Sequence, residues 1–168
     1  VSTPSKVFYF AFTPSFEKDG ADTKPMNVIL MIGDGMGLAH LSAGMYANGG
    51  ELTITNLKTT GWARTQSAND FTTDSAASGT ALSTGVKTNK GYIGKDVNGN
   101  DLMTMAERAR EAGKKVGIIT DEDLSGATPT AFTIHNISRN NTVELCNSMV
   151  EFRPDVLMCK NYGDVDAL

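Results

Sequence analysis

The sequence has few of the residues that build nitrogen- and sulfur-rich metal sites. Its 168 residues contain two cysteines and two histidines, namely Cys146, Cys159, His40 and His135. The cysteines are not spaced like a zinc knuckle, and this inventory cannot assemble a Cys/His zinc cluster. The cysteine pair does not decide the redox compartment, because one disulfide and two free buried thiols both remain open.

Long apolar runs and an excess of basic residues are also absent. No apolar run approaches the ~18 residues that cross a membrane, so we expect no membrane span. The net charge of −4 and the pI near 5.1 argue against a nucleic-acid binder, which needs a basic face, and are compatible with cation binding. The first residue is not Met, and no signal-peptide pattern follows it. We interpret the sequence as a processed or excerpted chain.

What is present is typical of a globular α/β protein. The length indicates one domain or part of a larger one, and 40% apolar and 20% charged residues are ordinary values. The short apolar run at 26–32, stopped by Gly33, predicts a strand buried on both faces, as in a parallel sheet. We predict an N-terminal extension or loop over residues 1–25 and an α/β domain over residues 26–168.

Strands and helices alternate along the rest of the chain. Helical spacing of apolar or small residues predicts helices at 38–46, 75–82, 101–112 and 141–152, the third capped by Asp101. Further strands are predicted at 58–65, 115–120 and 155–159, and a surface loop at 89–100. This alternation indicates an α/β fold with a mostly parallel sheet flanked by helices.

The first candidate site follows the strand at 26–32, in the segment 33–37, Gly-Asp-Gly-Met-Gly. Ligands of open α/β sheets bind at the carboxyl ends of strands, so the Asp34 carboxylate suits a divalent cation. A solvated Asp in a glycine-rich turn is the simpler alternative. A dinucleotide site is set aside, because the spacing is G-x-G-x-G and not G-x-G-x-x-G.

The second candidate is Ser75, in the segment 72–81 that opens a helix of small residues. Unpaired backbone N–H groups and the helix dipole favour a phosphate or a serine alkoxide there. An ordinary Ser N-cap is the commoner alternative. The segment 85–88, Gly-Val-Lys-Thr, is not a P-loop, because a valine separates Gly from Lys and no strand leads into it.

Two further side chains could take part in phosphate chemistry. Thr128 lies beyond the strand at 115–120, where a hydroxyl is a plausible ligand of a hard cation, although a turn Thr before Pro is the simpler interpretation. Arg139 has a guanidinium fork that suits bidentate phosphate binding, although a lone surface Arg is usually just solvated.

Taken together and in order, these segments resemble the alkaline phosphatase family. The matching pieces run from about residue 26 to at least residue 139 and comprise 27–37, 73–81, 83–88, 127–129 and 135–139. The Asp-Ser-Ala-Ala-Ser piece is highly specific and argues against a sulfatase or a phosphomutase. The Gly-Asp-Gly-Met-Gly piece is shared more loosely with related metal-dependent phosphatases and sulfatases.

The resemblance implies a hydrolase of phosphomonoester substrates that releases inorganic phosphate through a phosphoserine intermediate, with zinc and magnesium as cofactors. It implies that Ser75 is the nucleophile, with its oxygen on a zinc ion, and that Asp34 bridges this zinc and a magnesium ion. It implies that Thr128 is a magnesium ligand and that Arg139 clamps two phosphate oxygens. A periplasmic or secreted location is implied by the resemblance alone, and a homodimer is compatible with it.

Two departures from the family pattern bear on the metals. Gly126 stands where many members have Asp or His, which puts the third metal in question. The family's remaining His, Asp and Glu ligands lie in a C-terminal half, and Asp34, Ser75 and Thr128 alone do not satisfy zinc. We therefore expect the fold to be incomplete at the C-terminus and this polypeptide alone to be inactive. The alternative is a truncated, non-catalytic module that binds phosphate or metal.

Overall fold

The computed structural model describes residues 8–12 and 27–162. The chain divides into two compact units, Ser5–Arg64 and Thr65–Leu168, the second including Val1–Pro4. Of the predicted N-terminal extension over 1–25, only Phe8–Phe12 lies within the described residues. The predicted domain division at residue 26 stays a prediction.

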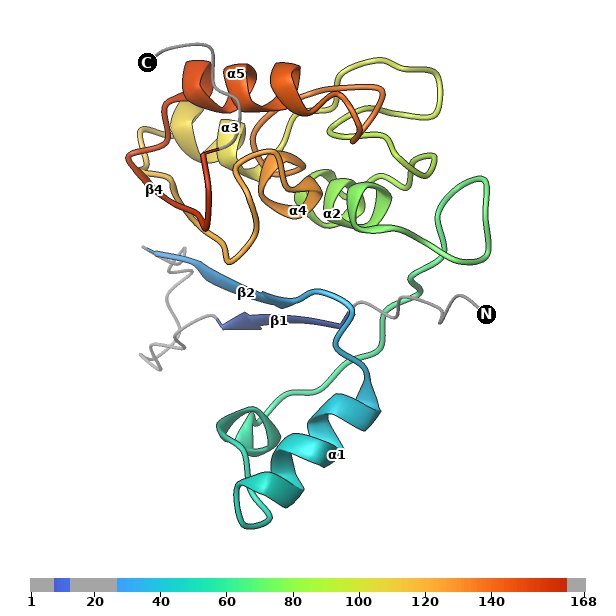
Figure 1. Ribbon diagram of the computed structural model, residues 1–168, viewed down its shortest axis with the longest axis vertical. Helices are drawn as coiled ribbons and strands as arrows, with labels where there is room; N and C mark the ends of the chain where they lie inside the picture. Colours follow the sequence, from blue (N-terminus) through green and yellow to red (C-terminus); the bar gives the residue numbers. More distant parts are fainter. Residues whose placement is uncertain (1–7, 13–26, 163–168) are drawn as a thin grey trace, which may run out of the picture. The chain divides into compact units, whose positions relative to one another are not determined.

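The unit Ser5–Arg64 contains a two-stranded antiparallel sheet followed by a helix. Strand β1 (Phe8–Phe12) pairs with β2 (Ile29–Gly33), and α1 (Leu38–Ala47) and the short 3-10 helix η1 (Thr53–Asn56) follow (Figure 1). The strand predicted at 26–32 and the helix predicted at 38–46 are thus confirmed, apart from their boundaries. The pairing of β2 with β1 is antiparallel, which the sequence did not predict.

The prediction that this strand is buried on both faces is wrong. Ile29 and Met31 are 63% and 66% exposed, and they share one face of β2 because alternate side chains of a strand point the same way. That face is therefore mostly exposed. The strand predicted at 58–65 is also wrong, since these residues form no regular structure. Gly61 in the middle of that run weakens a strand, and no described strand pairs with it.

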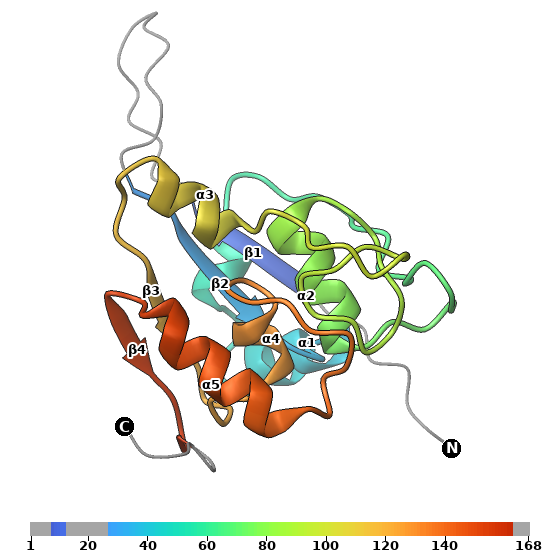
Figure 2. The same cartoon turned by 90° about the horizontal axis from the view of Figure 1, so that it is seen from above.

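The unit Thr65–Leu168 holds the remaining elements and confirms the α/β class with parallel strands and flanking helices. Its strands pair in parallel, Gly117 opposite Val156 and Ile119 opposite Met158. Figures 1 and 2 both show α2 and α4 side by side. In chain order its elements are α2 (Ser75–Thr84), α3 (Met105–Glu111), β3 (Gly117–Ile119), α4 (Ala127–Thr130), α5 (Thr142–Phe152) and β4 (Val156–Met158).

Helix α3 begins later than predicted because Thr104, and not Asp101, is its cap. The Thr104 hydroxyl accepts from the Glu107 N–H at 3.2 Å, and the Glu107 carboxylate accepts from the Thr104 N–H at 2.8 Å. This reciprocal capping box satisfies N–H groups that the helix itself cannot pair. Asp101 instead forms an ion pair with Lys95 in the predicted surface loop. The helix ends before Gly113, which has a φ of +70°, as predicted.

Two clusters of buried apolar side chains hold this unit together. The larger cluster joins α2 to α4 and α5, and its members are Ala76, Ile93, Ala127, Ala131, Ile134 and Leu145. The second contains Leu124, Cys146 and Met149, with Cys159 packed against it. No disulfide joins Cys146 to Cys159, and burial raises the pKa of the Cys159 thiol above its ordinary value. Of the two states left open by the sequence, the structure has the thiols and not the disulfide.

Helices α2 and α4 approach closely because α2 is built from small residues. A Cβ added at Gly79 would lie 2.9 Å from the Ala131 Cβ and 3.8 Å from the Thr128 Cα. Real Cβ atoms do not come so close, so glycine is what allows the contact with Ala131. The sequence run Ala-Ala-Ser-Gly-Thr-Ala thus sets the position of α4, and with it the position of Thr128.

None of the helices in the described residues is both long and apolar enough to cross a membrane.

Candidate active site

Ser75 is the first residue of α2, and the residue before it is the helix cap. Asp74 has extended backbone angles, and its Oδ1 accepts from the Ala77 N–H at 3.0 Å. The alternative of Ser75 as an ordinary N-cap is therefore wrong, because Asp74 already fills that role. Ser75 is partly exposed, so its hydroxyl is accessible at the positive end of a ten-residue helix.

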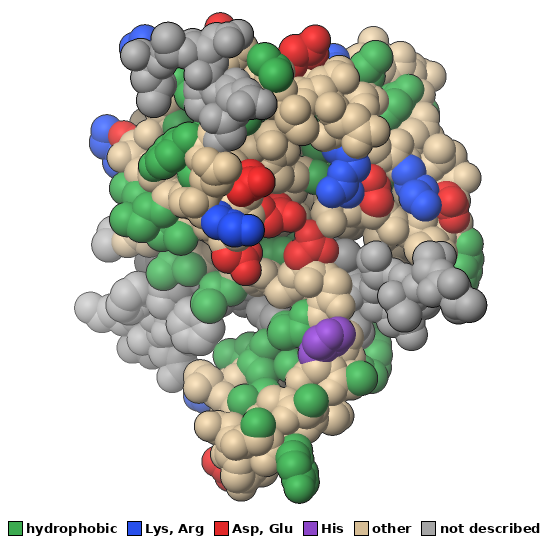
Figure 3. Space-filling view, in the orientation of Figure 1, with side chains coloured by type: hydrophobic (Ala, Val, Ile, Leu, Met, Phe, Trp, Pro, Cys, Tyr) green, Lys and Arg blue, Asp and Glu red, His purple; other side chains and the backbone are tan. Residues whose placement is uncertain are grey.

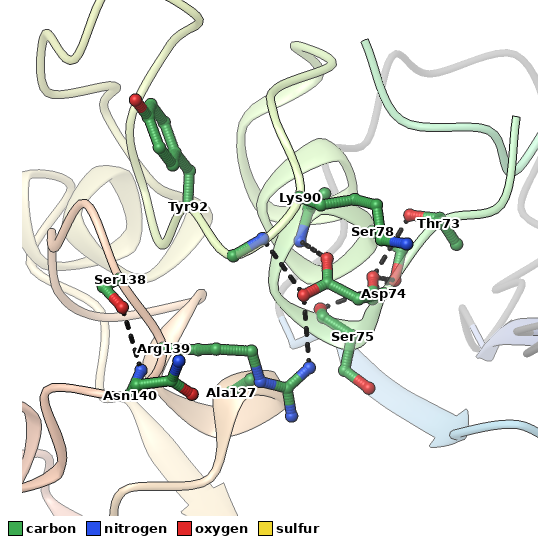
Figure 4. Close-up of polar contacts among 12 residues, drawn as sticks. Thr73, Asp74, Ser75, Ser78, Lys90, Tyr92, Ala127, Ser138, Arg139 and Asn140 are labelled. Atoms are coloured by element: carbon green, nitrogen blue, oxygen red, sulfur yellow. Dashed lines mark hydrogen bonds and ion pairs between the residues drawn. The ribbon is translucent and has the colours of Figure 1, made fainter. Parts of the chain in front are cut away.

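Arg139 reaches the same helix start from a distant part of the chain. Its Nη1 donates to Asp74 Oδ2 at 3.3 Å, and its backbone N–H donates to the Gly91 carbonyl at 2.8 Å. The Gly91 N–H in turn donates to Asp74 Oδ2 at 3.0 Å. Figure 4 shows the Arg139 guanidinium directed at the Asp74 carboxylate, next to Ser75. Asp74 thereby holds the guanidinium beside the residue that follows it, Ser75. The side chain of Arg139 is 36% exposed, which leaves it accessible to a ligand.

Sequence reasoning missed the role of Asp74. It singled out Ser75 and Arg139 without the residue that joins them. The available signal was local: an Asp directly before a predicted helix is a preferred cap residue. The ion pair to Arg139 spans 65 positions and had no signal in a single sequence.

A second ion pair lies next to this network. Lys90, adjacent to Gly91, donates its ammonium to Asp70 Oδ2 at 3.2 Å, and its backbone N–H donates to the Asn69 side chain at 3.0 Å. A hydrogen bond from the Thr72 N–H, followed by the one from Lys90, holds the pKa of the Asp70 carboxyl below its ordinary value. These contacts connect the loop before α2 to the loop after it, and so hold the two loops in place beside the helix that begins at Ser75.

Thr128 lies within α4 and not in the turn that was the simpler interpretation. It is half-buried, and its backbone faces Gly79 of α2 across the close helix contact. The structure thus brings Ser75, Thr128 and Arg139 into one unit, on or beside the packed helices α2 and α4. It does so through the buried Ala76, Ala127 and Ala131 cluster.

Asp34 belongs to the other unit, Ser5–Arg64. As predicted, it follows the carboxyl end of β2, in a turn closed by the Met36 N–H donating to the Gly33 carbonyl at 3.2 Å. Gly35 has a φ of +68°, which favours glycine. The Asp34 side chain is exposed.

Both histidines have local partners. His40 accepts from the Gly37 N–H at 3.1 Å and so caps α1. The His135 ring nitrogen Nε2 lies 3.0 Å from the Leu102 carbonyl and 3.5 Å from Glu107. Neither arrangement leads to a nitrogen-rich metal site.

The ability of the described residues to hold a metal differs between zinc and magnesium. In the part of the chain that the structure describes, no group of three or more His, Cys, Asp or Glu side chains could hold a metal ion. Zinc prefers such a set, so these residues do not fit a complete zinc site. Magnesium needs only one or two carboxylates with water and other oxygens, and the Thr128 hydroxyl is an oxygen of the kind it accepts.

Comparison with known proteins places the chain among the alkaline phosphatases. A model of the family described as alkaline phosphatase matches residues 25–157. The chain is 40% identical over 134 residues to alkaline phosphatase 4 of Bacillus subtilis, covering 74% of this chain and 29% of that protein. It is 41% identical over 133 residues to the alkaline phosphatase of Escherichia coli, covering 73% of this chain and 28% of that one. The chain therefore spans less than a third of the length of these relatives.

Solved structures give the same result. The cold-active alkaline phosphatase of Shewanella sp. matches with a TM-score of 0.65 and 36% identity, covering 74% of this chain and 33% of that one. The enzyme of the Antarctic bacterium TAB5 matches with a TM-score of 0.67 and 30% identity, covering 72% and 35%. Two similar structures are variants of the TAB5 enzyme, in which an aspartate or a glutamate replaces a histidine and Mg is bound in a site called M3.

Proposed function

The chain belongs to the alkaline phosphatase family, and from that premise we propose that the protein hydrolyses phosphoric monoesters through a phosphoserine intermediate on Ser75. The observation that carries the proposal is the contact between Asp74 and Arg139. One carboxylate caps the helix that begins at Ser75 and also holds a phosphate-binding type of side chain beside it. Family membership supports phosphatase chemistry, and the intermediate is the proposal's own step.

In the first step, the Ser75 Oγ attacks the phosphorus of the ester. The Oγ–P bond forms, the bond between phosphorus and the ester oxygen breaks, and the alcohol leaves with a proton. Water then attacks the phosphoserine phosphorus, the Oγ–P bond breaks, and inorganic phosphate and the free Ser75 hydroxyl result. The N–H groups and the dipole at the start of α2 favour the negative charge that develops there.

Arg139 would bind two oxygens of the phosphoryl group. A guanidinium has five N–H donors in a planar fork, and the contact with Asp74 uses one at Nη1. The remaining donors match the spacing of phosphate oxygens and stabilise their charge in the transition state. Asp74 is the positioning residue, because it fixes the direction in which the fork points.

Zinc and magnesium are the cofactors we propose, with Asp34 and Ser75 on zinc and with Asp34 and Thr128 on magnesium. When bound, the ions would lower the pKa of the serine hydroxyl and offset the charge of the phosphoryl oxygens. The described residues contain no group of three His, Cys, Asp or Glu ligands. We therefore expect further ligands from a C-terminal half, and no activity from the 168-residue chain alone.

Three other properties rest on the family resemblance. We propose that the substrates are phosphomonoesters. We also propose that the protein is periplasmic or secreted and that it forms a homodimer. Fractionation and light scattering of the complete protein test the last two.

Replacement of the nucleophile gives the direct test. In a completed enzyme, made by joining this chain to the C-terminal half of a relative, Ser75→Ala should lower kcat by at least ~10³-fold, because the attacking oxygen is gone. Ser78→Ala is the matched control on the same helix: it keeps the Ser75 hydroxyl and loses only an Oγ that donates to the backbone carbonyls of Asp74 at 2.7 Å and Ser75 at 3.4 Å. Hydrolysis of p-nitrophenyl phosphate measures activity, and intact mass after acid quenching detects phosphoserine.

The expected mass gain is one phosphoryl group, present in the Ser78→Ala variant and absent in the Ser75→Ala variant. A folded, metal-loaded completed enzyme without hydrolysis, or hydrolysis that survives the loss of Ser75, would overturn the proposal.

Removal of the guanidinium tests the clamp. Arg139→Ala should lower kcat/KM by ~10²- to 10³-fold and weaken inhibition by inorganic phosphate, because charge-assisted hydrogen bonds to the phosphoryl oxygens are lost. Arg139→Lys keeps the charge without the fork and should recover only part of the activity. Arg108→Ala, an exposed arginine of α3, is the control. Equal losses in Arg139→Ala and Arg108→Ala would show that only general charge matters.

The alternative for the 168-residue chain by itself is a non-catalytic module that binds phosphate or a divalent cation. It is favoured by the coverage of less than a third of the relatives' length and by the incomplete ligand set. Calorimetry of the chain with phosphate, Zn²⁺ and Mg²⁺ tests it. The absence of both heat and any shift in melting temperature would rule out this alternative.

A further inference from the structure

Gly91 holds both partners of the ion pair between Asp74 and Arg139 through its backbone. The Gly91 N–H donates to Asp74 Oδ2 at 3.0 Å, and the Gly91 carbonyl accepts from the Arg139 N–H at 2.8 Å. The guanidinium of Arg139 reaches the same Oδ2 at 3.3 Å. A change in the position of Gly91 would therefore move the carboxylate and the arginine together.

The backbone conformation of Gly91 is what lets one residue serve both partners. Its φ of +85° lies in the left-handed region, which glycine adopts readily and most other residues do not. A Cβ built at this position meets no atom within 4 Å, so crowding does not require glycine there. Because φ sets the direction of the N–H relative to the carbonyl, both contacts depend on the left-handed value. Glycine loses more conformational freedom on folding than any other residue, so its neighbours must restrain it.

Asn69, in the loop before α2, restrains the residue next to Gly91. The Asn69 Oδ1 accepts from the Lys90 N–H at 3.0 Å, so it bonds the backbone directly before Gly91. Asn69 is itself held by its turn, in which the hydroxyl of the buried Ser67 donates to the Asp70 carbonyl at 3.0 Å. The amide side chain thus connects a fixed turn to the loop that carries Gly91.

The ion pair between Lys90 and Asp70 is the weaker restraint on this loop. Its two side chains are 39% and 45% exposed, and exposed ion pairs contribute little because water and salt screen them. Figure 3 shows basic side chains beside acidic ones at the surface of the unit Thr65–Leu168. The Lys90 ammonium also lies at the end of a flexible four-carbon chain, whereas Asn69 bonds the backbone N–H itself. The hydrogen bond from Lys90 to Asn69 therefore limits the position of Gly91 more closely.

The direction of the Arg139 guanidinium decides how well it can bind a phosphoryl group. A planar fork binds two oxygens only where its donors point at them, and a misplacement of about 1 Å can cost ~10²-fold in rate. Arg139 is restrained by its Nη1 on Asp74 and by its backbone N–H on Gly91. Because Gly91 also holds Asp74, both restraints depend on the loop that Asn69 supports.

We propose that Asn69 is a positioning residue for phosphate binding, which acts through Gly91 on Asp74 and Arg139. The inference rests on the proposed function, because that function makes Arg139 bind the phosphoryl oxygens. Asn69 sets the affinity for phosphate from outside the guanidinium and its carboxylate partner. The orientation of the guanidinium thus depends on the loop before α2 as well as on the helix that begins at Ser75.

Binding of inorganic phosphate to the completed, metal-loaded enzyme tests the inference without reliance on turnover. Asn69→Ala removes the acceptor for the Lys90 N–H and should raise the dissociation constant, measured by calorimetry, by ~5- to 10-fold. Asn69→Asp keeps an oxygen in that place and should stay within ~2-fold of the unchanged enzyme at ~0.15 M salt, which screens its added charge.

Asn89→Ala is the matched control in the same loop. Asn89 directly precedes Lys90, and its side chain donates to the Val97 carbonyl at 3.3 Å. The substitution therefore removes a hydrogen bond of the loop without removing the one at Lys90, and it should leave the dissociation constant for phosphate within ~2-fold. Thermal melting of every variant checks that it is folded at the temperature of the measurement.

The Arg139→Ala background separates positioning from a general loosening of the fold. Once the guanidinium is gone, Asn69→Ala has nothing left to misplace and should change the dissociation constant for phosphate by less than ~2-fold. An equal loss of ~5- to 10-fold in both backgrounds would mean that Asn69 acts independently of Arg139, which overturns the inference.

Substitutions at position 91 test the same path with Asn69 in place. Alanine and asparagine both add a side chain where there is open space, but asparagine adopts a left-handed φ more readily. Gly91→Ala should therefore weaken phosphate binding at least ~3-fold more than Gly91→Asn does. Equal affinities of the two variants would show that the conformation of Gly91 does not direct the guanidinium, and the inference would fail.

The outcomes separate this inference from the proposed function. Unchanged phosphate binding in Asn69→Ala, or equal weakening in Asn89→Ala, overturns the role of Asn69, and the proposed function stands if Ser75 is still phosphorylated. Weaker binding in Asn69→Ala that disappears in the Arg139→Ala background supports the inference. If Ser75 is never phosphorylated in that enzyme, the proposed function fails while the inference stands as a statement about phosphate binding.

Discussion

The two units of the chain differ in how they hold their site residues. Every buried side chain that the structure describes lies between Ser67 and Met149, in the unit Thr65–Leu168. In the unit Ser5–Arg64, the helix α1 has no buried residue, and the β2 residues Ile29 and Met31 are mostly exposed. Ser75, Thr128 and Arg139 therefore belong to a packed scaffold, whereas Asp34 follows a strand with an uncovered face. Buried packing within this chain therefore supports Ser75, Thr128 and Arg139 more than it supports Asp34.

Amide hydrogen exchange of the 168-residue chain should show the largest contrast. We expect amides of α2 and α5 to exchange at least ~10³-fold more slowly than those of α1, relative to their intrinsic rates, because buried packing sets the local opening free energy. Mass spectrometry of peptides from residues 75–84, 142–152 and 38–47 measures it. Equal protection of α1 would break the comparison.

Two glycine substitutions, one in each unit, test the same difference in packing at single positions. Gly94 and Gly49 both have positive φ angles, at +60° and +74°, so alanine is strained at either position. A Cβ at Gly94 would lie 2.2 Å from the Ile134 carbonyl oxygen, whereas nothing lies within 4 Å at Gly49. Gly94→Ala should destabilise the chain by ~3 kcal/mol and Gly49→Ala by ~1 kcal/mol.

Denaturant unfolding followed by circular dichroism measures both values. The stated order is the prediction, and similar losses in the two variants would mean that backbone strain, and not the close packing of residues 65–162, governs Gly94.

The smallest effect concerns the ion pair that anchors the parallel strands. A hydrogen bond from the Lys115 ammonium, followed by the one from the Val116 N–H, lowers the pKa of the Asp155 carboxyl. A carboxyl whose pKa is lowered in the folded state stabilises the fold at pH values above its ordinary pKa. This stabilisation is lost as the pH falls through the lowered pKa. Asp155→Asn should therefore reduce the melting temperature slightly at pH 7.

At about pH 3 and below, the Asp155→Asn variant and the unchanged chain should melt at closer temperatures, because the carboxyl is then losing its charge in both states. Differential scanning calorimetry at both pH values is the check. A difference that grows as the pH falls contradicts the assigned sign.

Periodicity in the sequence predicted most of the packed unit. The small-residue run predicted α2, the helical spacing at 141–152 predicted α5, and the apolar runs predicted β3 and β4 and their parallel pairing. The start of α3 was missed because Asp101 and Thr104 are both good caps, and only the Glu107 side chain, three residues after Thr104, decides between them.

The candidate site was predicted less completely. Motif order proposed Ser75, Asp34 and Thr128 as site residues, but contacts between distant residues leave no pattern in one sequence. The contact between Asp74 and Arg139 is of this kind. The uncovered face of β2 was missed for a related reason, since an apolar run records the tendency to be buried and not the partner that buries it.

One carboxylate couples three separate segments of the packed unit. Asp74 accepts from the Ala77 N–H in α2, from the Gly91 N–H in the loop and from the guanidinium of Arg139. Free-energy coupling between sites is reciprocal, so a ligand that tightens Arg139 against Asp74 also steadies the Gly91 loop and the first turn of α2. Conversely, substitutions at Asp74 and Arg139 should be non-additive, because either one removes the same ion pair.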